Sequence, residues 1–171
     1  MTTEEIFSDL AAHMIKGLMA HSQLADYYRF LGLPSYADCH EKHYKSESCN
    51  WRKLSKYFIT HYNKFIPVKP VDDPEIIPNG WYGATRQEVD TNTIRKSVQK
   101  GLETWVAWEK ETKSFYETHY KNLMDNEEVA AAMFIKKFVC DVDDELAEAE
   151  EWHLYKKATD YDIGHLIGEQ S

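Results

Sequence analysis

Apolar side chains recur at steps of three and four residues along four long stretches of the chain, and this spacing places them on one face of a helix. We predict helices over residues 3–31, 35–64, 92–124 and 129–160, each about thirty residues and so ~45 Å long. Thr3 is the expected cap of the first helix, and the Asp or Asn of the turn "MDNEE" is that of the fourth. The pattern predicts an all-α protein.

The same spacing predicts which face of each helix is buried. On the second helix the predicted stripe is Ala37, His40, Tyr44, Glu47, Trp51, Leu54, Phe58 and Tyr62. On the fourth helix it is Val129, Met133, Ile135, Phe138, Val139, Val142, Leu146, Ala149 and His153. Both stripes are mostly apolar and each contains a histidine, but only that of the second helix also contains a glutamate.

Between the second and third helices the pattern breaks down over residues 65–91, where an Asn-Gly pair and clustered prolines forbid continuous helix. A loop of this length is uncommon unless it has a task, and crossing the full length of a bundle is such a task. Two helices, a long crossover and two helices therefore predict a four-helix bundle. We expect one domain over residues 1–171, with residues 161–171 as a short tail. The clustered prolines are Pro67, Pro70, Pro74 and Pro78.

The charge balance limits the partners of the chain. Twenty Lys and Arg residues stand against twenty-nine Asp and Glu residues, which gives a formal net charge of −9. Such a field repels nucleic acid and anionic membranes, and no block of basic residues interrupts it. We therefore expect neither nucleic-acid binding nor membrane binding.

The three cysteines, Cys39, Cys49 and Cys140, form no Cys-x-x-Cys pair, and their odd number argues against a disulfide framework. The opening stretch "MTTEEIFSDL" lacks the positive charge and the apolar run of a secretory signal, and no apolar run approaches ~18 residues. These features predict reduced thiols and a cytoplasmic protein.

The stretch "GLPSYADCHEKHYKSESCNWRKLSKYFI" resembles the segment of bacterioferritins and ferritins that runs from the end of their first helix through their second. The resemblance implies the ferritin-like fold, a four-helix bundle with a long crossover between its second and third helices. It also implies a di-iron pattern, in which two helices each supply a Glu and the other two each supply a Glu-x-x-His.

Matched to that pattern, Glu47 occupies the glutamate position of the second helix and Asn50 occupies its histidine position. Glu109 falls where the third helix has its glutamate. Glu145 falls at the histidine position of the fourth helix. The resemblance thus retains three carboxylates out of a set of six ligands.

Two ligand positions carry unsuitable side chains, since the first-helix ligand falls near Met14 and the fourth-helix glutamate falls at Val142. His21, two turns after Met14, falls near a position where the family often has a tyrosine close to its metals. Three carboxylates and one imidazole are enough for one divalent ion, but too few for two irons. The resemblance therefore implies an incomplete di-iron site that binds iron or manganese, with these candidate metal residues: Glu47, Glu109, Glu145, His21 and Asn50.

An alternative hypothesis has no metal. Long helices with 29% charged residues place some acids near an apolar stripe by chance, and the changed ligand positions are then signs of lost chemistry. In that case the bundle is a scaffold or a protein-interaction module, and its acids pair with lysines such as Lys16 or Lys137. The sequence leaves both hypotheses open, and with them the question of whether the protein is an enzyme.

Other candidate groups are weaker. Glu150 and His153 keep the Glu-x-x-His spacing, but they lie more than one turn from the level of Glu109. His40 and His43 are expected to be buried and satisfied by neighbouring side chains. No Gly-x-Ser-x-Gly elbow and no phosphate-binding glycine loop occurs.

The aromatic content, 13% of the residues, exceeds what a small core needs and predicts a homo-oligomer, at least a dimer. Ferritin-like chains also assemble into closed shells. We expect no shell here, because the proline-rich crossover is bulky and would interfere with shell contacts.

Overall fold

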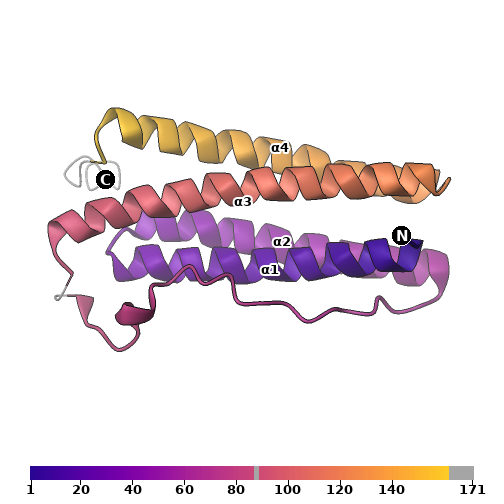
Figure 1. Ribbon diagram of the computed structural model, residues 1–171, viewed down its shortest axis with the longest axis horizontal. Helices are drawn as coiled ribbons and strands as arrows, with labels where there is room; N and C mark the ends of the chain where they lie inside the picture. The colour runs from indigo at the N-terminus through magenta and orange to yellow at the C-terminus, as the bar shows by residue number, and fades with distance from the viewer. Residues whose placement is uncertain (87–88, 162–171) are drawn as a thin grey trace.

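The computed structural model describes residues 1–86 and 89–161 and is all-α over that part of the chain. Its four long helices are α1 (Thr3–Phe30), α2 (Pro34–Tyr62), α3 (Thr91–Asp125) and α4 (Val129–Ala158). One turn of 3-10 helix, η1 (Asn79–Trp81), lies in the crossover. Figure 1 shows the helices side by side along one long axis, with α1 against α2 and α3 against α4. The predicted four-helix bundle is confirmed.

The helix ends match the predicted bounds within a few residues, but two predicted caps are wrong. The cap of α1 is Thr2, not Thr3: its side chain accepts a hydrogen bond from the Glu5 backbone, and the Glu5 side chain accepts one from the Thr2 backbone. The residue before α4 is Glu128, which makes no side-chain cap. Its carboxylate instead accepts a hydrogen bond from the Tyr62 hydroxyl at 3.1 Å, which ties α2 to the start of α4.

Two of the predicted stripes also need correction. On α2 the residue that turns inward is His43, which is 3% exposed, whereas the predicted Tyr44 is 42% exposed. On α4 the predicted Val129 and Met133 are 53% and 51% exposed. The core contact there comes from the small side chains beside them, Ala131, Ala132 and, one turn on, Ile135.

The buried apolar side chains form two clusters, one at each end of the bundle. One is built on the first half of α1 and the second half of α2, and includes Leu10, Phe58 and Ile135. The other is built on the opposite halves and includes Leu24 and Trp105. Between them lies a level of ionisable side chains, which we call the polar layer: His21, His40, His43, Glu47 and Glu109, which are buried, and Glu145, which is partly buried.

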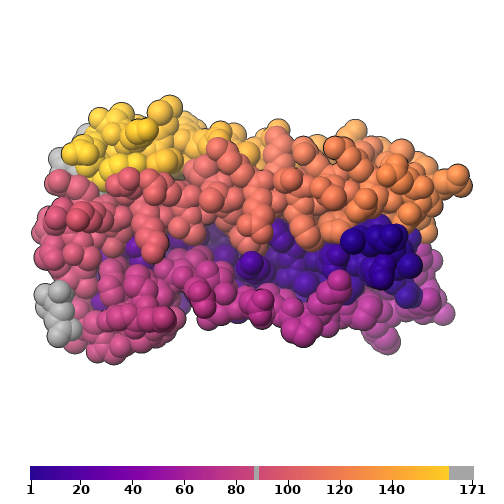
Figure 2. All heavy atoms as spheres, viewed as in Figure 1, coloured from indigo at the N-terminus to yellow at the C-terminus, as the bar shows by residue number. Residues whose placement is uncertain are grey.

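The described part of the crossover, residues 63–86 and 89–90, runs along α1 from one end of the bundle to the other (Figure 1). Figure 2 shows it as a ridge beside the exposed strip of α1. Gln23 of α1 holds it at two points, because its amide donates to the Asp73 carboxylate at 2.6 Å and accepts from the Ile76 backbone at 3.0 Å. Further along, Trp81 stacks on Tyr27 with ring centroids 5.3 Å apart.

The predicted tail beyond residue 161 lies outside the described residues. Among the described helices, none combines the length and the apolar composition that spanning a bilayer requires.

Candidate metal centre

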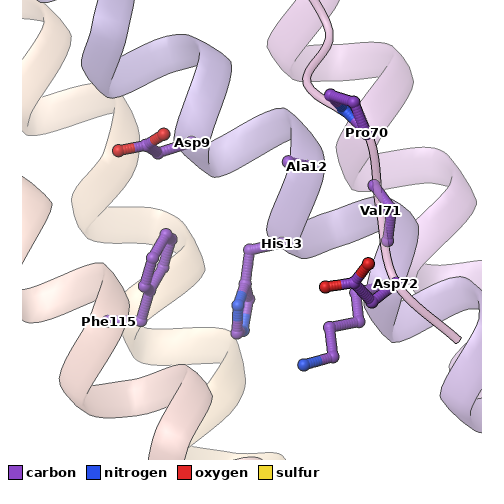
Figure 3. A pocket seen from close by; sticks show the side chains of 8 residues that line it. Asp9, Ala12, His13, Pro70, Val71, Asp72 and Phe115 are labelled. Carbon is purple, nitrogen blue, oxygen red and sulfur yellow. The ribbon is translucent and has the colours of Figure 1, made fainter. Parts of the chain in front are cut away.

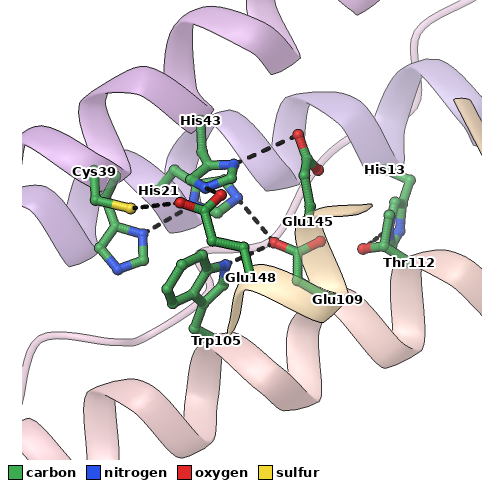
Figure 4. A network of polar contacts seen from close by, with 10 residues as sticks. His13, His21, Cys39, His43, Trp105, Glu109, Thr112, Glu145 and Glu148 are labelled. Atoms are coloured by element: carbon green, nitrogen blue, oxygen red, sulfur yellow. Dashed lines mark hydrogen bonds and ion pairs between the residues drawn. The ribbon is translucent and has the colours of Figure 1, made fainter. Parts of the chain in front are cut away.

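The polar layer receives side chains from all four helices of the bundle. His21 comes from α1, His43 and Glu47 from α2, Glu109 from α3 and Glu145 from α4. Figure 4 shows most of these side chains converging on one region between the helices. Among the predicted metal residues, His21 lies 3.5 Å from Glu109, and Glu47 is close enough to Glu109 and Glu145 for their charges to affect its pKa.

Glu109 is completely buried. Its Oε1 accepts a hydrogen bond from the indole Nε1 of Trp105 at 2.9 Å and lies 3.5 Å from Nε2 of His21. Its Oε2 is buried and has no hydrogen-bond partner. The indole therefore holds the carboxylate in one orientation and leaves its second oxygen available.

Glu47 is only 5% exposed, and its carboxyl group lies against α1. Gly17 makes this approach possible, because a Cβ at that position would be 3.2 Å from Oε1 of Glu47. Burial, together with the nearby carboxylates of Glu145 and Glu109, raises the pKa of Glu47 well above its usual value. Its Oε2 also lacks a hydrogen-bond partner. None of the described ion pairs gives Glu47, Glu109 or Glu145 a lysine or arginine.

His21 is fully buried and contacts a second histidine. Its Nδ1 lies 3.2 Å from Nδ1 of His40, so one of these two nitrogens donates a proton and the other accepts it. Burial, with His21 and His43 nearby, lowers the pKa of His40 well below its usual value, so His40 is neutral. When His21 is the donor, its Nε2 carries a lone pair directed toward the Glu109 side, as a metal ligand requires.

Glu145 lies at the edge of the polar layer, with a side chain that is 18% exposed. Its Oε1 is 3.5 Å from Nδ1 of His43. Burial favours the neutral ring of His43, but hydrogen bonds to Cys39 and Glu145 outweigh this and raise its pKa to about 10. The ring also faces Glu148, whose Oε2 is 3.5 Å from Nε2 of His43.

Asn50, the fifth predicted residue, is 8% exposed and lies on the wall of a groove rather than among the buried acids. The groove has a volume of about 450 Å³ and runs between α2 and α4. Its wall also includes His43 and Glu145, so it connects the polar layer with solvent. The remaining residues that line it are Lys42, Ser46, Cys49, Lys53, Asp141, Asp144 and Glu148.

Met14 and Val142, which occupy two ligand positions of the family pattern, have apolar surroundings in the structure. Met14 is completely buried and Val142 is 1% exposed, and both belong to the apolar cluster next to the polar layer. Neither side chain offers oxygen or nitrogen to a hard cation. The polar layer therefore lacks the six ligand residues of a di-iron pair.

The other candidate groups do not form a site. Glu150 pairs with Lys110 at 2.9 Å on the surface, whereas Nε2 of His153 lies 3.0 Å from the Tyr161 hydroxyl, so the two residues do not converge. Lys16, a predicted partner of the acids, lies over the Trp108 ring at 5.9 Å.

Three side chains next to the polar layer are not among the residues predicted from the sequence: Trp105, Cys39 and Glu148. His43 is buried and faces two carboxylates, which agrees with the expectation that neighbouring side chains satisfy it. The spacing along the helices indicates which face Cys39 and Glu148 share with the polar layer. Cys39, His43 and Glu47 follow each other at steps of four, and Glu148 follows Glu145 by three, so each group shares a helix face.

No family model matches the chain, and no curated protein matches its sequence. Function is therefore argued from the chemistry of the site.

Proposed function

We propose that the polar layer binds one divalent metal ion, iron or manganese, through Glu47, Glu109, Glu145 and His21. One observation carries the proposal: Glu47 and Glu109 are both buried, and each has a carboxylate oxygen without a hydrogen-bond partner. A buried carboxylate is costly unless it is paired, hydrogen-bonded or bound to a metal. A cation between these oxygens removes that cost.

The ligand types suit this choice of metal. Carboxylate oxygens favour manganese and iron, and an imidazole nitrogen adds affinity for iron. The charge supports it too, because a divalent cation offsets the mutual repulsion of carboxylates that have no lysine or arginine partner in the described part of the chain. Asn50 lines the groove outside these ligands, where it is placed to hydrogen-bond a water on the entering ion.

The groove offers the ion a route from solvent. Four of the residues that line it are acidic, and two are lysines; the acidic ones are Asp141, Asp144, Glu145 and Glu148. A cleft with an excess of negative charge concentrates cations at its mouth.

The order of the helices, the long crossover and the level shared by Glu47, Glu109 and Glu145 support a ferritin-like relationship for this chain. The apolar positions of Met14 and Val142 favour a second candidate, a ferritin-like bundle that has lost its metal and acts as a scaffold or interaction module. The two candidates differ in one measurable property, the binding of metal.

The test is metal binding by the full-length protein, freed of metal by chelation and titrated with Mn²⁺ or, without oxygen, with Fe²⁺. We expect one equivalent per chain. The double variant Glu47→Gln, Glu109→Gln is expected to lose it, while Glu111→Gln, an exposed position on the same helix as Glu109, keeps it. No binding by the wild type, or unchanged binding by the double variant, would favour the scaffold.

The cellular setting is part of the proposal. The three cysteines are free thiols in the structure, which supports a reducing compartment such as the cytoplasm. We keep the expectation of a dimer, and of no binding to nucleic acid because of the net charge of −9. Sedimentation of the purified protein tests the dimer.

A further inference from the structure

Three side chains of different chemistry meet where α2 faces α4: Cys39, His43 and Glu148. One ligand atom from each lies within 4.8 Å of the other two. The Cys39 thiol donates to Oε1 of Glu148 at 3.9 Å, and Nε2 of His43 lies 3.5 Å from Oε2 of the same carboxylate. Figure 4 shows the sulfur, the ring and the carboxylate directed toward one another.

The spacing agrees with tetrahedral metal coordination. Zinc binds sulfur at about 2.3 Å and nitrogen or oxygen at about 2.0–2.1 Å, which places neighbouring ligand atoms roughly 3.3–3.5 Å apart. The two contacts above, at 3.9 and 3.5 Å, are near this range but involve different oxygens of Glu148. One ligand atom from each of the three residues lies within 4.8 Å of the others, so the group must contract when it binds an ion. Cys39 and His43 lie one turn apart on α2, so the helix itself sets their separation.

The His43 ring gives a second, independent indication. It is 3% exposed, and its Nε2 has no hydrogen-bond partner although it faces Glu148. On the opposite side of the ring, Nδ1 lies 3.5 Å from Oε1 of Glu145. The ring lies between two carboxylates and holds both of its protons, so an ion at Nε2 must displace one of them. Glu145 then accepts the remaining Nδ1 proton and fixes the ring and its tautomer.

We propose that Cys39, His43 and Glu148 form a second cation site, with the ligand preference of zinc. A thiolate next to an imidazole selects a softer ion than the carboxylates of the polar layer do. Three protein ligands leave the fourth position to a water or small ligand, and His43 and Glu148 both line the groove from which it would arrive. The site uses neither Glu47 nor Glu109, but it shares Glu145 with the proposed function, because that carboxylate contacts its His43.

Co²⁺ is a suitable probe, because cobalt bound to a thiolate has a charge-transfer absorption in the near ultraviolet that oxygen ligands do not give. The protein should carry Cys49→Ser and Cys140→Ser, which change two exposed thiols and leave Cys39 as the sole cysteine. One equivalent of Co²⁺ is expected to produce the band, and one equivalent of Zn²⁺ to remove it. Absence of the band from this protein overturns the proposal.

Variants separate this site from the polar layer. Adding Cys39→Ser should abolish the band, and Glu148→Gln should weaken Co²⁺ binding by about tenfold or more. Adding Glu47→Gln and Glu109→Gln should leave the band unchanged even if Mn²⁺ binding is lost. A band that is insensitive to Glu148→Gln, or that disappears with the Glu47 and Glu109 changes in a protein of wild-type helicity, contradicts the assignment.

Discussion

His13 and His21 lie two turns apart on α1 and are both buried, yet their surroundings differ. His13 is stacked between Trp108 and Phe115, with ring centroids 4.8 and 4.3 Å away, and its Nε2 is hydrogen-bonded to Thr112 at 2.9 Å. It adjoins the pocket between α1, α3 and the crossover (Figure 3). His21 instead faces a carboxylate with its Nε2.

His13 has the contacts of a histidine that packs in a core, whereas His21 has a ring nitrogen that faces a carboxylate. Around His13 the neighbours are aromatic rings and a hydroxyl, and the ring nitrogen that faces α3 has its partner. In the polar layer, by contrast, Nε2 of both His21 and His43 and Oε2 of both Glu47 and Glu109 have none. Native interiors leave few such groups unsatisfied. Four of the buried polar atoms without a partner thus belong to the polar layer, although Nε1 of Trp108 and Nδ1 of His119, both near His13, also lack one.

The largest expected effect is an increase in the stability of the whole protein on metal binding. This increase should require the acids of the polar layer and should not require His13. At a free Mn²⁺ concentration about a thousandfold above Kd, binding adds about 4 kcal/mol to the free energy of unfolding. For a chain of this size that raises Tm by roughly 8–16 °C. Calorimetry should show the increase in wild type and in His13→Gln. Its presence in the Glu47→Gln, Glu109→Gln variant would be inconsistent with the proposed site.

The next effect belongs to His13 and depends on pH. Burial, with Lys16 and His119 nearby, lowers its pKa to about 4, below the 6.5 of a free histidine. The unfolded chain therefore binds the proton first as pH falls. The contribution of His13 is constant above pH 6.5 and becomes unfavourable below it, reaching about 3 kcal/mol at pH 4. Asp9, Lys16 and Asp72 line the same pocket.

Comparison of wild type with His13→Gln separates the contribution of His13 to the pH dependence of stability from the contributions of other titrating groups. Urea unfolding of both proteins at pH 7, 5 and 4 should show wild type losing more stability than the variant as pH falls. Parallel losses in the two proteins would mean that the ring is protonated in the folded state.

A smaller effect concerns Gly17, the residue that allows Glu47 to approach α1. In Gly17→Ala the new Cβ would press on the Glu47 carboxylate, so we expect Mn²⁺ binding to weaken about tenfold, or about 1.4 kcal/mol. Stability without metal should change by less than about 1 kcal/mol, because alanine is the better helix former. In a Glu47→Gln background the substitution should have no further effect on binding. Additive losses would show that Gly17 acts elsewhere.

The smallest expected effect is an increase in the stability of the metal-free protein. Without metal, Glu47 is a buried carboxyl group beside two other carboxylates, so Glu47→Gln should stabilise the metal-free protein by about 1 kcal/mol. Urea unfolding after chelation measures it, with Glu111→Gln as a surface control expected to stay within about 0.5 kcal/mol. A loss of stability in Glu47→Gln would mean that the carboxylate already has a stabilising partner.

Periodicity was sufficient to predict the bundle because helices of this length repeat their apolar face many times, and single misplacements average out. It failed where side-chain size misled it. Tyr44 was taken as the inward residue because it is large and apolar, but His43 shares the face of Glu47, one turn away. On α4 the alanines that pack inside carry little hydrophobic signal, so Val129 and Met133 were chosen instead.

The candidate site was predictable to the extent that it follows helix register. The resemblance to ferritins indicates Glu47, Glu109, Glu145 and His21; in the structure His21 faces Glu109, and Glu145 faces His43. The contribution of Trp105 was not predictable, because its contact with Glu109 depends on a side-chain orientation that spacing does not specify. The meeting of Cys39 with Glu148 depends on how α2 and α4 are aligned along the bundle axis, which no local pattern reports.

The most direct test of the central claim is a crystal structure of the full-length protein grown with Mn²⁺, with diffraction measured at a wavelength where manganese scatters anomalously. The account predicts one strong anomalous peak inside the bundle, bonded to oxygens of both Glu47 and Glu109. A bundle without a peak there, with these two carboxyl groups hydrogen-bonded to protein or water, would contradict it.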